Sequence, residues 1–253
     1  MKIGLKNAGN YSIMGIVIKI GVILMKYEIL LFDADHTLFD FQKSEYYALK
    51  DALATLGLPS SDEHIERYSE INVKYWKMLE RGEIDKTSLR LARFEEFCDF
   101  YGFDRALAGT LADTYMENLS HNAHLFDGAL EMIEKLSESY RLFIITNGVK
   151  STQDGRFGIS PITKYFENIF ISEVIGAEKP SEIFFSAVER GIEGFERERA
   201  LVIGDSLSSD IGGALNYGLD CIWFNQRGKE APEGWNITYN VRTFDEILRI
   251  LEN

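Results

Sequence analysis

The chain has 253 residues, of which 45% are hydrophobic and 26% are charged, and its formal net charge is −13. These proportions are ordinary for a soluble protein with one large domain, or with a core domain and a smaller one. A surface of this charge repels nucleic-acid phosphates, so binding to DNA or RNA is not expected. A small phosphorylated substrate stays compatible with it, because a metal ion and one lysine can reverse the field locally.

The two cysteines, Cys98 and Cys221, lie in apolar surroundings and lack the spacing of a metal site. We expect both to be buried free thiols in a reducing compartment, which predicts a cytoplasmic location.

Residues 1–25 form an N-terminal extension of doubtful status. Its apolar part, Tyr11–Met25, contains Lys19 and is shorter than the roughly 20 residues of a membrane-spanning helix. No membrane partner is therefore expected. One hypothesis is that translation starts at Met25, directly before the first strand, and the alternative is a membrane-surface or signal segment.

In the remaining chain, the pattern of apolar residues is mainly helical up to about residue 125 and then alternates between strands and helices. Residues Tyr27–Phe32 are a short apolar run that predicts a buried strand. Four helical patterns follow, at Ser44–Leu56, Asp62–Arg81, Lys86–Tyr101 and Asp104–Ser120. Breaks at glycines separate them, and no clear strand lies among them.

After residue 125, apolar strands alternate with helices. The strands are expected at Leu142–Thr146, Asn168–Ser172, Ala200–Ile203 and Cys221–Phe224, and the helices at Gly128–Glu138, Ser181–Arg190, Asp210–Tyr217 and Phe244–Leu251. This alternation predicts an α/β fold with a Rossmann-like parallel sheet covered on both faces. The core domain would comprise residues 26–40 and 125–253, and residues 41–124 would form an inserted helical cap domain over the carboxyl ends of the strands.

Carboxylates follow two of these strands. Asp33 and Asp35 come directly after the first, and side chains two apart on an extended segment point the same way. Two such carboxylates repel each other unless a cation intervenes, although a solvated acidic turn is the alternative. Asp205 follows Ala200–Ile203 and can bind a hard cation through oxygen. Ser209 or Asp210 could cap the next helix, and Asp210 could instead orient the site and a nearby lysine.

Two further signals are weak when taken singly. Thr146, Asn147 and Gly148 follow a strand, where a hydroxyl and backbone N–H groups could hold phosphate oxygens. A simple Asn-Gly turn is the alternative. Lys179 precedes Pro180 at a helix start, where the helix dipole disfavours a cation, so a phosphate or carboxylate partner is expected.

Taken in order, DADHT, TNG, KP and GDSLSSD each follow or lie between apolar strands. This series resembles the four motifs of the haloacid dehalogenase superfamily, in the branch with an α-helical cap, over residues 26 to about 250. The resemblance implies that Asp33 is a nucleophile that forms an aspartyl-phosphate and that Asp35 is the general acid and base. Thr37 and Thr146 would bond the phosphate or the nucleophile, and Lys179 would offset the negative charge.

The same resemblance implies a Mg²⁺ cofactor. Its ligands would be the carboxylates of Asp33 and Asp205 and the backbone carbonyl of Asp35. An acid at position 35 also distinguishes phosphate chemistry from dehalogenation, because a carbon–halogen bond needs no protonated leaving group. His36 occupies a position where the family often has glycine, and we interpret it as a partly exposed loop residue.

The strings FDADHTLFDF, TNG, GAEKP and GDSLSSDIGGALNYG resemble the bacterial pyrimidine 5′-nucleotidases. The implied activity is release of phosphate from nucleoside monophosphates by a monomer or homodimer. Alternatives are a phosphatase for phosphoglycolate or a sugar phosphate, a phosphomutase, and a non-catalytic Mg²⁺-binding module. One or two cap aromatics could stack on a base, although most are expected in the core. Arg90 and Arg93 are assigned to a solvated face, with contact to substrate as the alternative.

Overall fold

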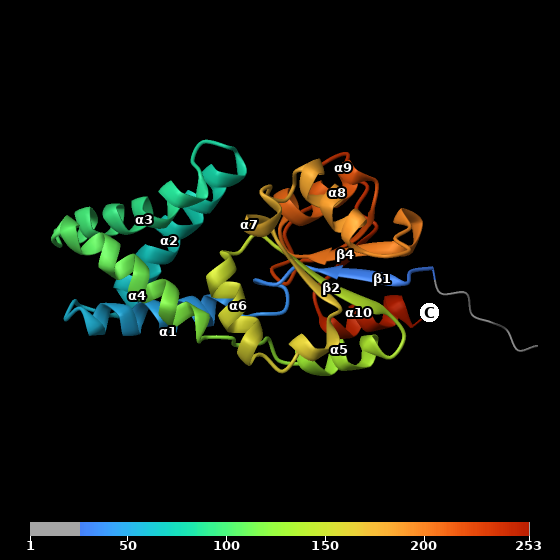
Figure 1. The fold of residues 1–253 in the computed structure, drawn as a ribbon, viewed down its shortest axis with the longest axis horizontal. Helices are drawn as coiled ribbons and strands as arrows, with labels where there is room; N and C mark the ends of the chain where they lie inside the picture. The colour runs from blue at the N-terminus through green and yellow to red at the C-terminus, as the bar shows by residue number, and fades with distance from the viewer. Residues whose placement is uncertain (1–25, 253) are drawn as a thin grey trace, which may run out of the picture.

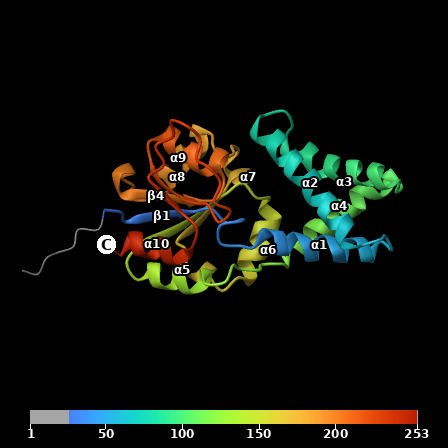
Figure 2. The same cartoon turned by 180° about the vertical axis from the view of Figure 1, so that it is seen from behind.

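The computed structural model describes residues 26–252, and the N-terminal extension predicted for residues 1–25 lies outside them. Figures 1 and 2 show two parts: a sheet with helices above and below it, and a group of helices, α1 to α4, at one side. Within residues 26–252, no helix is both long enough and apolar enough to cross a membrane.

The sheet has six parallel strands in the order β3-β2-β1-β4-β5-β6. They are β1 (Ile29–Phe32), β2 (Arg141–Thr146), β3 (Asn168–Ile171), β4 (Ala200–Gly204), β5 (Asp220–Phe224) and β6 (Tyr239–Val241). The register pairs Phe32 with Ile144 on one side and with Ile203 on the other. In this order the connection reverses between β1 and β4, which is where parallel sheets of this kind bind ligands.

Both faces of the sheet are buried, as the apolar strands predict. Leu30 and Phe32 contact the side covered by α5 (Ala129–Ser137) and α10 (Phe244–Leu251). Ile29 and Leu31 contact the other side, covered by α8 (Glu182–Gly191) and α9 (Gly212–Tyr217). The α/β prediction is therefore confirmed. Strand β6 was not predicted, because three residues with one buried apolar side chain give no measurable alternation.

The cap helices form a hydrophobic core of their own. They are α1 (Phe41–Thr55), α2 (Asp62–Glu80), α3 (Lys86–Tyr101) and α4 (Ala108–Ser120), with a 3₁₀ turn at Arg105–Leu107 before α4. The buried cluster among them includes Leu49, Tyr68, Phe94 and Tyr115. All four helices fall within residues 41–124, and the exact domain boundaries stay a prediction.

Local side chains define the ends of these helices. Asp40 and Asp85 each accept a hydrogen bond from the backbone N–H three residues later, which satisfies a free donor at the start of α1 and α3. Gly102 ends α3 with a φ of 67°, a left-handed conformation that suits glycine. The breaks read from the sequence therefore have a direct backbone cause.

Helix α6 (Lys150–Ile159) was missed. Its sequence, KSTQDGRFGI, contains two glycines and little apolar periodicity, so propensity argues against a helix. Gly155 has a tertiary reason: a Cβ there would lie 2.7 Å from the Cβ and the carbonyl oxygen of Ser120 at the end of α4. Figure 1 shows α6 between the cap helices and the sheet. Glycine permits this close packing, which brings the polar face of α6 to the site.

The cap also contacts the core at its far end. Ser208, after β4, donates a hydrogen bond of 2.8 Å to Glu80 at the end of α2. Lys86 at the start of α3 donates one of 2.8 Å to Ser172, the first residue of α7 (Ser172–Ile175). The tip between α2 and α3 therefore lies over the carboxyl edge of the sheet.

Candidate active site

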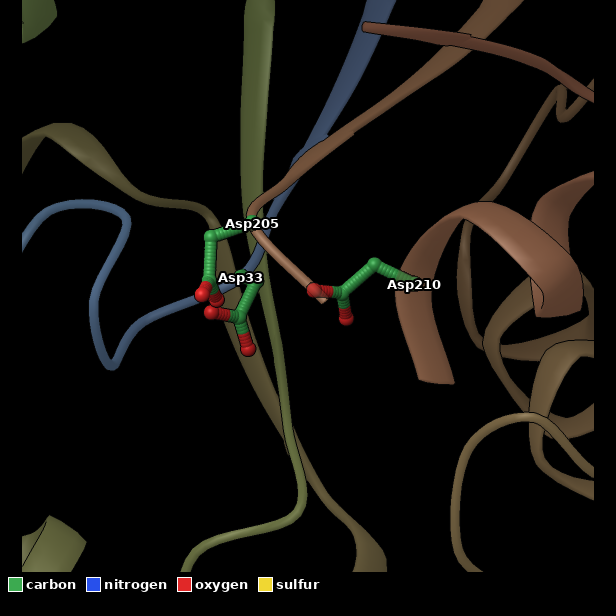
Figure 3. Close-up of side chains that lie close together, drawn as sticks. All are labelled: Asp33, Asp205 and Asp210. Atoms are coloured by element: carbon green, nitrogen blue, oxygen red, sulfur yellow. The ribbon is translucent and has the colours of Figure 1, made fainter. Parts of the chain in front are cut away.

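Three aspartates meet at the carboxyl ends of β1 and β4. Asp33 directly follows β1, Asp205 directly follows β4, and Asp210 lies in the π-helical turn Leu207–Ile211 that precedes α9. Each offers an oxygen atom, and these oxygens lie within 4.8 Å of one another. Figure 3 shows the carboxylates of Asp33 and Asp205 beside each other, with the carboxylate of Asp210 directed toward them. Three carboxylate donors are a ligand set suited to a hard cation such as Mg²⁺.

Lys179 is the positive charge of this cluster. Its Nζ donates to Asp33 Oδ1 and Asp210 Oδ1, each at 2.7 Å, and to the carbonyl of Ile145 at 2.8 Å. The residue is 1% exposed. Burial alone would lower the pKa of this lysine, but the neighbouring carboxylates of Asp210 and Asp33 outweigh burial and raise it. The ammonium group therefore stays charged.

One lysine does not balance three carboxylates. The pKa of Asp33 is raised to about 7. Burial is the largest cause, the charge of Asp210 also raises the pKa, and the charge of Lys179 lowers it. Burial and the charges of Asp33 and Asp210 also raise the pKa of Asp205 well above its usual range. A cation bound between Asp33 and Asp205 would remove this cost, and the residues present therefore fit a divalent metal.

The residues predicted to contact phosphate lie around this cluster. Thr37 Oγ1 donates to Asp33 Oδ2 at 3.0 Å, and Thr146 Oγ1 accepts from the N–H of Gly148 at 3.0 Å. Asn147 behaves differently, because both of its side-chain amide atoms bond the backbone of Lys179, at 2.8 and 2.9 Å. Asn147 therefore positions the lysine, and a phosphate contact from its side chain would break this pair.

Asp35 is held by α6, which the sequence did not indicate. Gln153 Nε2 donates to Asp35 Oδ2 at 2.9 Å, and Arg156 Nη1 forms an ion pair with Asp35 Oδ1. Gln153 also donates to Thr146 Oγ1 at 2.9 Å. The sequence did contain a signal for these residues: Thr152, Gln153 and Arg156 follow the TNG motif at spacing i, i+1, i+4, which places three polar side chains on one face of a helix. It was not used because the segment was not predicted as a helix.

The start of the helix after β4 differs from the prediction. We expected Ser209 or Asp210 to cap it, but Ser206 does so: its Oγ accepts from the N–H of Ser209 at 3.2 Å. Asp210 Oδ2 accepts from the N–H of Ser206 at 3.0 Å while its other oxygen holds Lys179. A Cβ at Gly204 would overlap the Asp210 carboxylate, so glycine is required there.

Two other expectations can be compared with the structure. His36 is exposed, as expected, and its φ of 63° explains why glycine suits this position. The solvated face predicted for the two arginines of α3 holds for Arg90, which is exposed and pairs with Asp113. It is wrong for Arg93, which is buried because Asn72, Met116 and three aromatic rings surround its guanidinium group.

A pocket opens between the cap and the core beside Asp35. Its lining includes Phe41, Trp76 and Arg93 from the cap and Thr152 and Arg156 from α6. Both described cysteines are buried and unpaired, as predicted, and lie outside this lining. The pocket therefore places cap side chains next to the predicted general acid.

The fold and the site together define an α/β enzyme with an acidic active site at the point where strand order reverses. A family model described as haloacid dehalogenase-like hydrolase matches residues 30–224, and the chain belongs to this family. The resemblance seen in the four motifs is thereby confirmed.

Relatives with curated names cover nearly the whole chain. Pyrimidine 5′-nucleotidase PynA of Streptococcus pneumoniae is 35% identical over 90% of this chain and 96% of its own length. Pyrimidine 5′-nucleotidase YjjG of Escherichia coli is 28% identical over 90% of this chain and 99% of its own. These relatives confirm the prediction of a phosphatase-class enzyme similar to 5′-nucleotidases.

A solved structure shows the same architecture. The putative hydrolase YfnB of Bacillus subtilis, described as bound to magnesium and as revealing interdomain movement, superposes with a TM-score of 0.85. It is 34% identical and covers 90% of this chain and 100% of its own. The site roles of individual residues, the oligomeric state and the cytoplasmic location stay predictions.

Proposed function

We propose that this protein hydrolyses pyrimidine nucleoside 5′-monophosphates to nucleoside and phosphate, with Mg²⁺ as cofactor. The observation that carries this proposal is the cluster in which buried Lys179 contacts Asp33 while Asp205 lies beside it. The pyrimidine substrate rests on the resemblance to PynA and YjjG. The proposal excludes a purely metal-binding module, because such a module has no need for a buried lysine on its metal ligand.

In the first step, an oxygen of Asp33 attacks phosphorus and the bond from phosphorus to the 5′-oxygen breaks. Asp35, which must carry a proton when the substrate is bound, donates that proton to the departing oxygen, and the nucleoside leaves with a free 5′-hydroxyl group. In the second step, Asp35 takes a proton from water, which attacks the aspartyl-phosphate and regenerates Asp33. Gln153 and Arg156 orient Asp35 between these steps. Lys179 and Thr37 hold Asp33 in line with the phosphate.

The metal would be held by the carboxylates of Asp33 and Asp205 and the backbone carbonyl of Asp35. When bound, it supplies positive charge against the transferring phosphoryl group. Asp210 is assigned a different role, because it accepts hydrogen bonds from Lys179 Nζ and from the backbone N–H of Ser206. Its role is to position the lysine.

A substrate panel tests the proposal. We expect hydrolysis of UMP and dTMP with Mg²⁺ to exceed that of AMP, phosphoglycolate and glucose 6-phosphate by at least about tenfold in kcat/KM, and EDTA to abolish it. Phosphate release by the purified protein is the measurement. Equal rates across the panel would refute the nucleotidase proposal, and preference for another ester would assign that ester instead. Conversion to an isomeric phosphate without release would indicate a phosphomutase.

The acidic cluster also predicts how Mg²⁺ binding depends on pH. The pKa of Asp33 is raised to about 7 in the metal-free protein, so this group contributes stability at low pH that is lost as pH rises toward 7. Metal binding needs the ionised carboxylates and therefore strengthens over the same range. We expect Mg²⁺ to raise Tm more at about pH 8 than at about pH 5.5, and Asp205→Asn to remove most of the increase. A shift that is equal at both pH values would contradict this arrangement.

A further inference from the structure

The pocket beside Asp35 contains buried donors without partners. Among the described residues, six buried side-chain polar atoms lack a hydrogen-bond partner, and three of them belong to residues that line this pocket: Arg93 Nε, Thr152 Oγ1 and Arg156 Nη2. These residues are 3%, 4% and 1% exposed. Buried polar groups are normally paired, so an unpaired group in a pocket indicates a ligand that supplies the missing partner. Arginine N–H groups only donate, so the ligand must bring acceptors.

The cap fixes the position of Arg93. Its Nη1 donates to Asn72 Oδ1 at 2.6 Å, and Asn72 in turn donates to Glu45 Oε1 at 2.6 Å. Glu45 also accepts from Ser69 Oγ at 2.6 Å, so both carboxylate oxygens act as acceptors. The Arg93 guanidinium group lies 5.2 Å from the ring centre of Phe94. Nη2 donates to Met116 Sδ at 3.4 Å, so Nε is the one guanidinium nitrogen of this pocket residue that lacks a partner.

The charges of the pocket favour a neutral acceptor. Arg93 is balanced by Glu45 through Asn72, and Arg156 is balanced by Asp35. An anionic group such as a second carboxylate would add uncompensated negative charge here, whereas a carbonyl oxygen would not. The rings of Trp76 and Phe41 complete the lining, and a flat heterocycle can stack on such rings.

We infer that Arg93 and Trp76 are the residues that select the base of the nucleotide: Arg93 donates to a ring carbonyl, and Trp76 stacks on the ring. The inference rests on the proposed function and deepens it, because it assigns substrate recognition to two cap residues. A pyrimidine supplies the acceptor through a ring carbonyl oxygen, whereas adenine has no carbonyl and offers only ring nitrogens. Asp35 lines the same pocket, so the nucleoside would lie on the leaving-group side of the phosphate.

The test compares variants by their substrate ratios. For wild type, Arg93→Met, Arg93→Lys, Trp76→Ala and Trp76→Phe, kcat and KM are measured with UMP, AMP and phosphoglycolate. We expect Arg93→Met and Trp76→Ala to lower the kcat/KM ratio of UMP to phosphoglycolate by at least about tenfold, mainly through KM. Trp76→Phe keeps a ring and should retain most of the ratio. Arg90→Met, on the exposed face of the same helix, is the matched control and should leave the ratio unchanged.

A check of folding and a binding measurement without catalysis accompany the kinetic test. Loss of Arg93 removes the positive charge near the buried Glu45 and the donor to Asn72 Oδ1, so circular dichroism checks each fold. If Arg93→Met does not fold, the variants of half-buried Trp76 still test the inference. Calorimetry with free uridine reports on the pocket without catalysis, and Trp76→Ala should abolish its binding. Folded variants that keep the wild-type ratio, or that bind uridine as wild type does, overturn the inference. A wild type that binds uridine but shows no preference for UMP refutes the proposed function and leaves the pocket assignment intact.

Discussion

Asp33→Asn is expected to lower kcat for UMP by at least about four orders of magnitude, because an amide cannot attack phosphorus. The fold should survive the change. The amide retains the shape of the side chain and removes one of the three clustered carboxylates, so repulsion in the buried cluster decreases. The measurement is single-turnover phosphate release together with a thermal melt. A melting temperature equal to or above that of wild type would show that the lost activity has a chemical cause.

Two other substitutions of aspartate by asparagine, Asp205→Asn and Asp104→Asn, are controls for Asp33→Asn. Asp205→Asn removes a predicted metal ligand and should weaken Mg²⁺ binding, so that part of its activity returns at high Mg²⁺. Asp104 lies in the cap and caps a 3₁₀ turn away from the cluster, so its substitution by asparagine should keep the wild-type rate. Activity retained by pure Asp33→Asn protein at any Mg²⁺ concentration would refute the aspartyl-phosphate mechanism.

Lys179→Met is expected to be the most destabilising single substitution in the site. The side chain is 1% exposed and donates to two carboxylates, which would be left buried without compensation. Removing one partner of such a pair costs about 3–5 kcal/mol in the free energy of unfolding. Activity should also be lost, because the charge beside the nucleophile is gone. Denaturant unfolding at about pH 7 measures the first effect, and phosphate release measures the second.

A second substitution distinguishes the electrostatic cause from a packing defect. Lys179→Met combined with Asp210→Asn removes one of the two abandoned charges and should regain part of the stability without regaining activity. The penalty of Lys179→Met should also shrink at about pH 5, where the carboxyl groups with raised pKa values, Asp33 and Asp205, take up protons. A penalty that is independent of pH and of Asp210 would indicate lost packing instead.

Features that depend on neighbouring residues in the sequence were predictable, whereas contacts between residues far apart in the sequence were not. Strands were predictable because short apolar runs, such as residues 29–32 and 200–203, leave few alternatives to a buried parallel sheet. Once the sheet is parallel, the residue after each strand reaches the same edge, and this places Asp33 near Asp205 without knowledge of any side-chain contact. The cap helices were predictable for a similar local reason, since glycines separate them, although α1 begins at Phe41 and not at the predicted Ser44.

What the sequence alone determined is therefore five of the six strands of the sheet, the inserted helices and the presence of acidic groups at one edge. The tertiary structure decided which groups meet across long separations. Arg156 pairs with Asp35 because Gly155 lets α6 pack against α4, and neither propensity nor spacing reports that contact. Arg93 lies in a buried pocket, although its spacing from Arg90 is typical of a solvated face, because surrounding helices cover it. Local free energies define the elements, whereas burial and charge pairing between elements define the site.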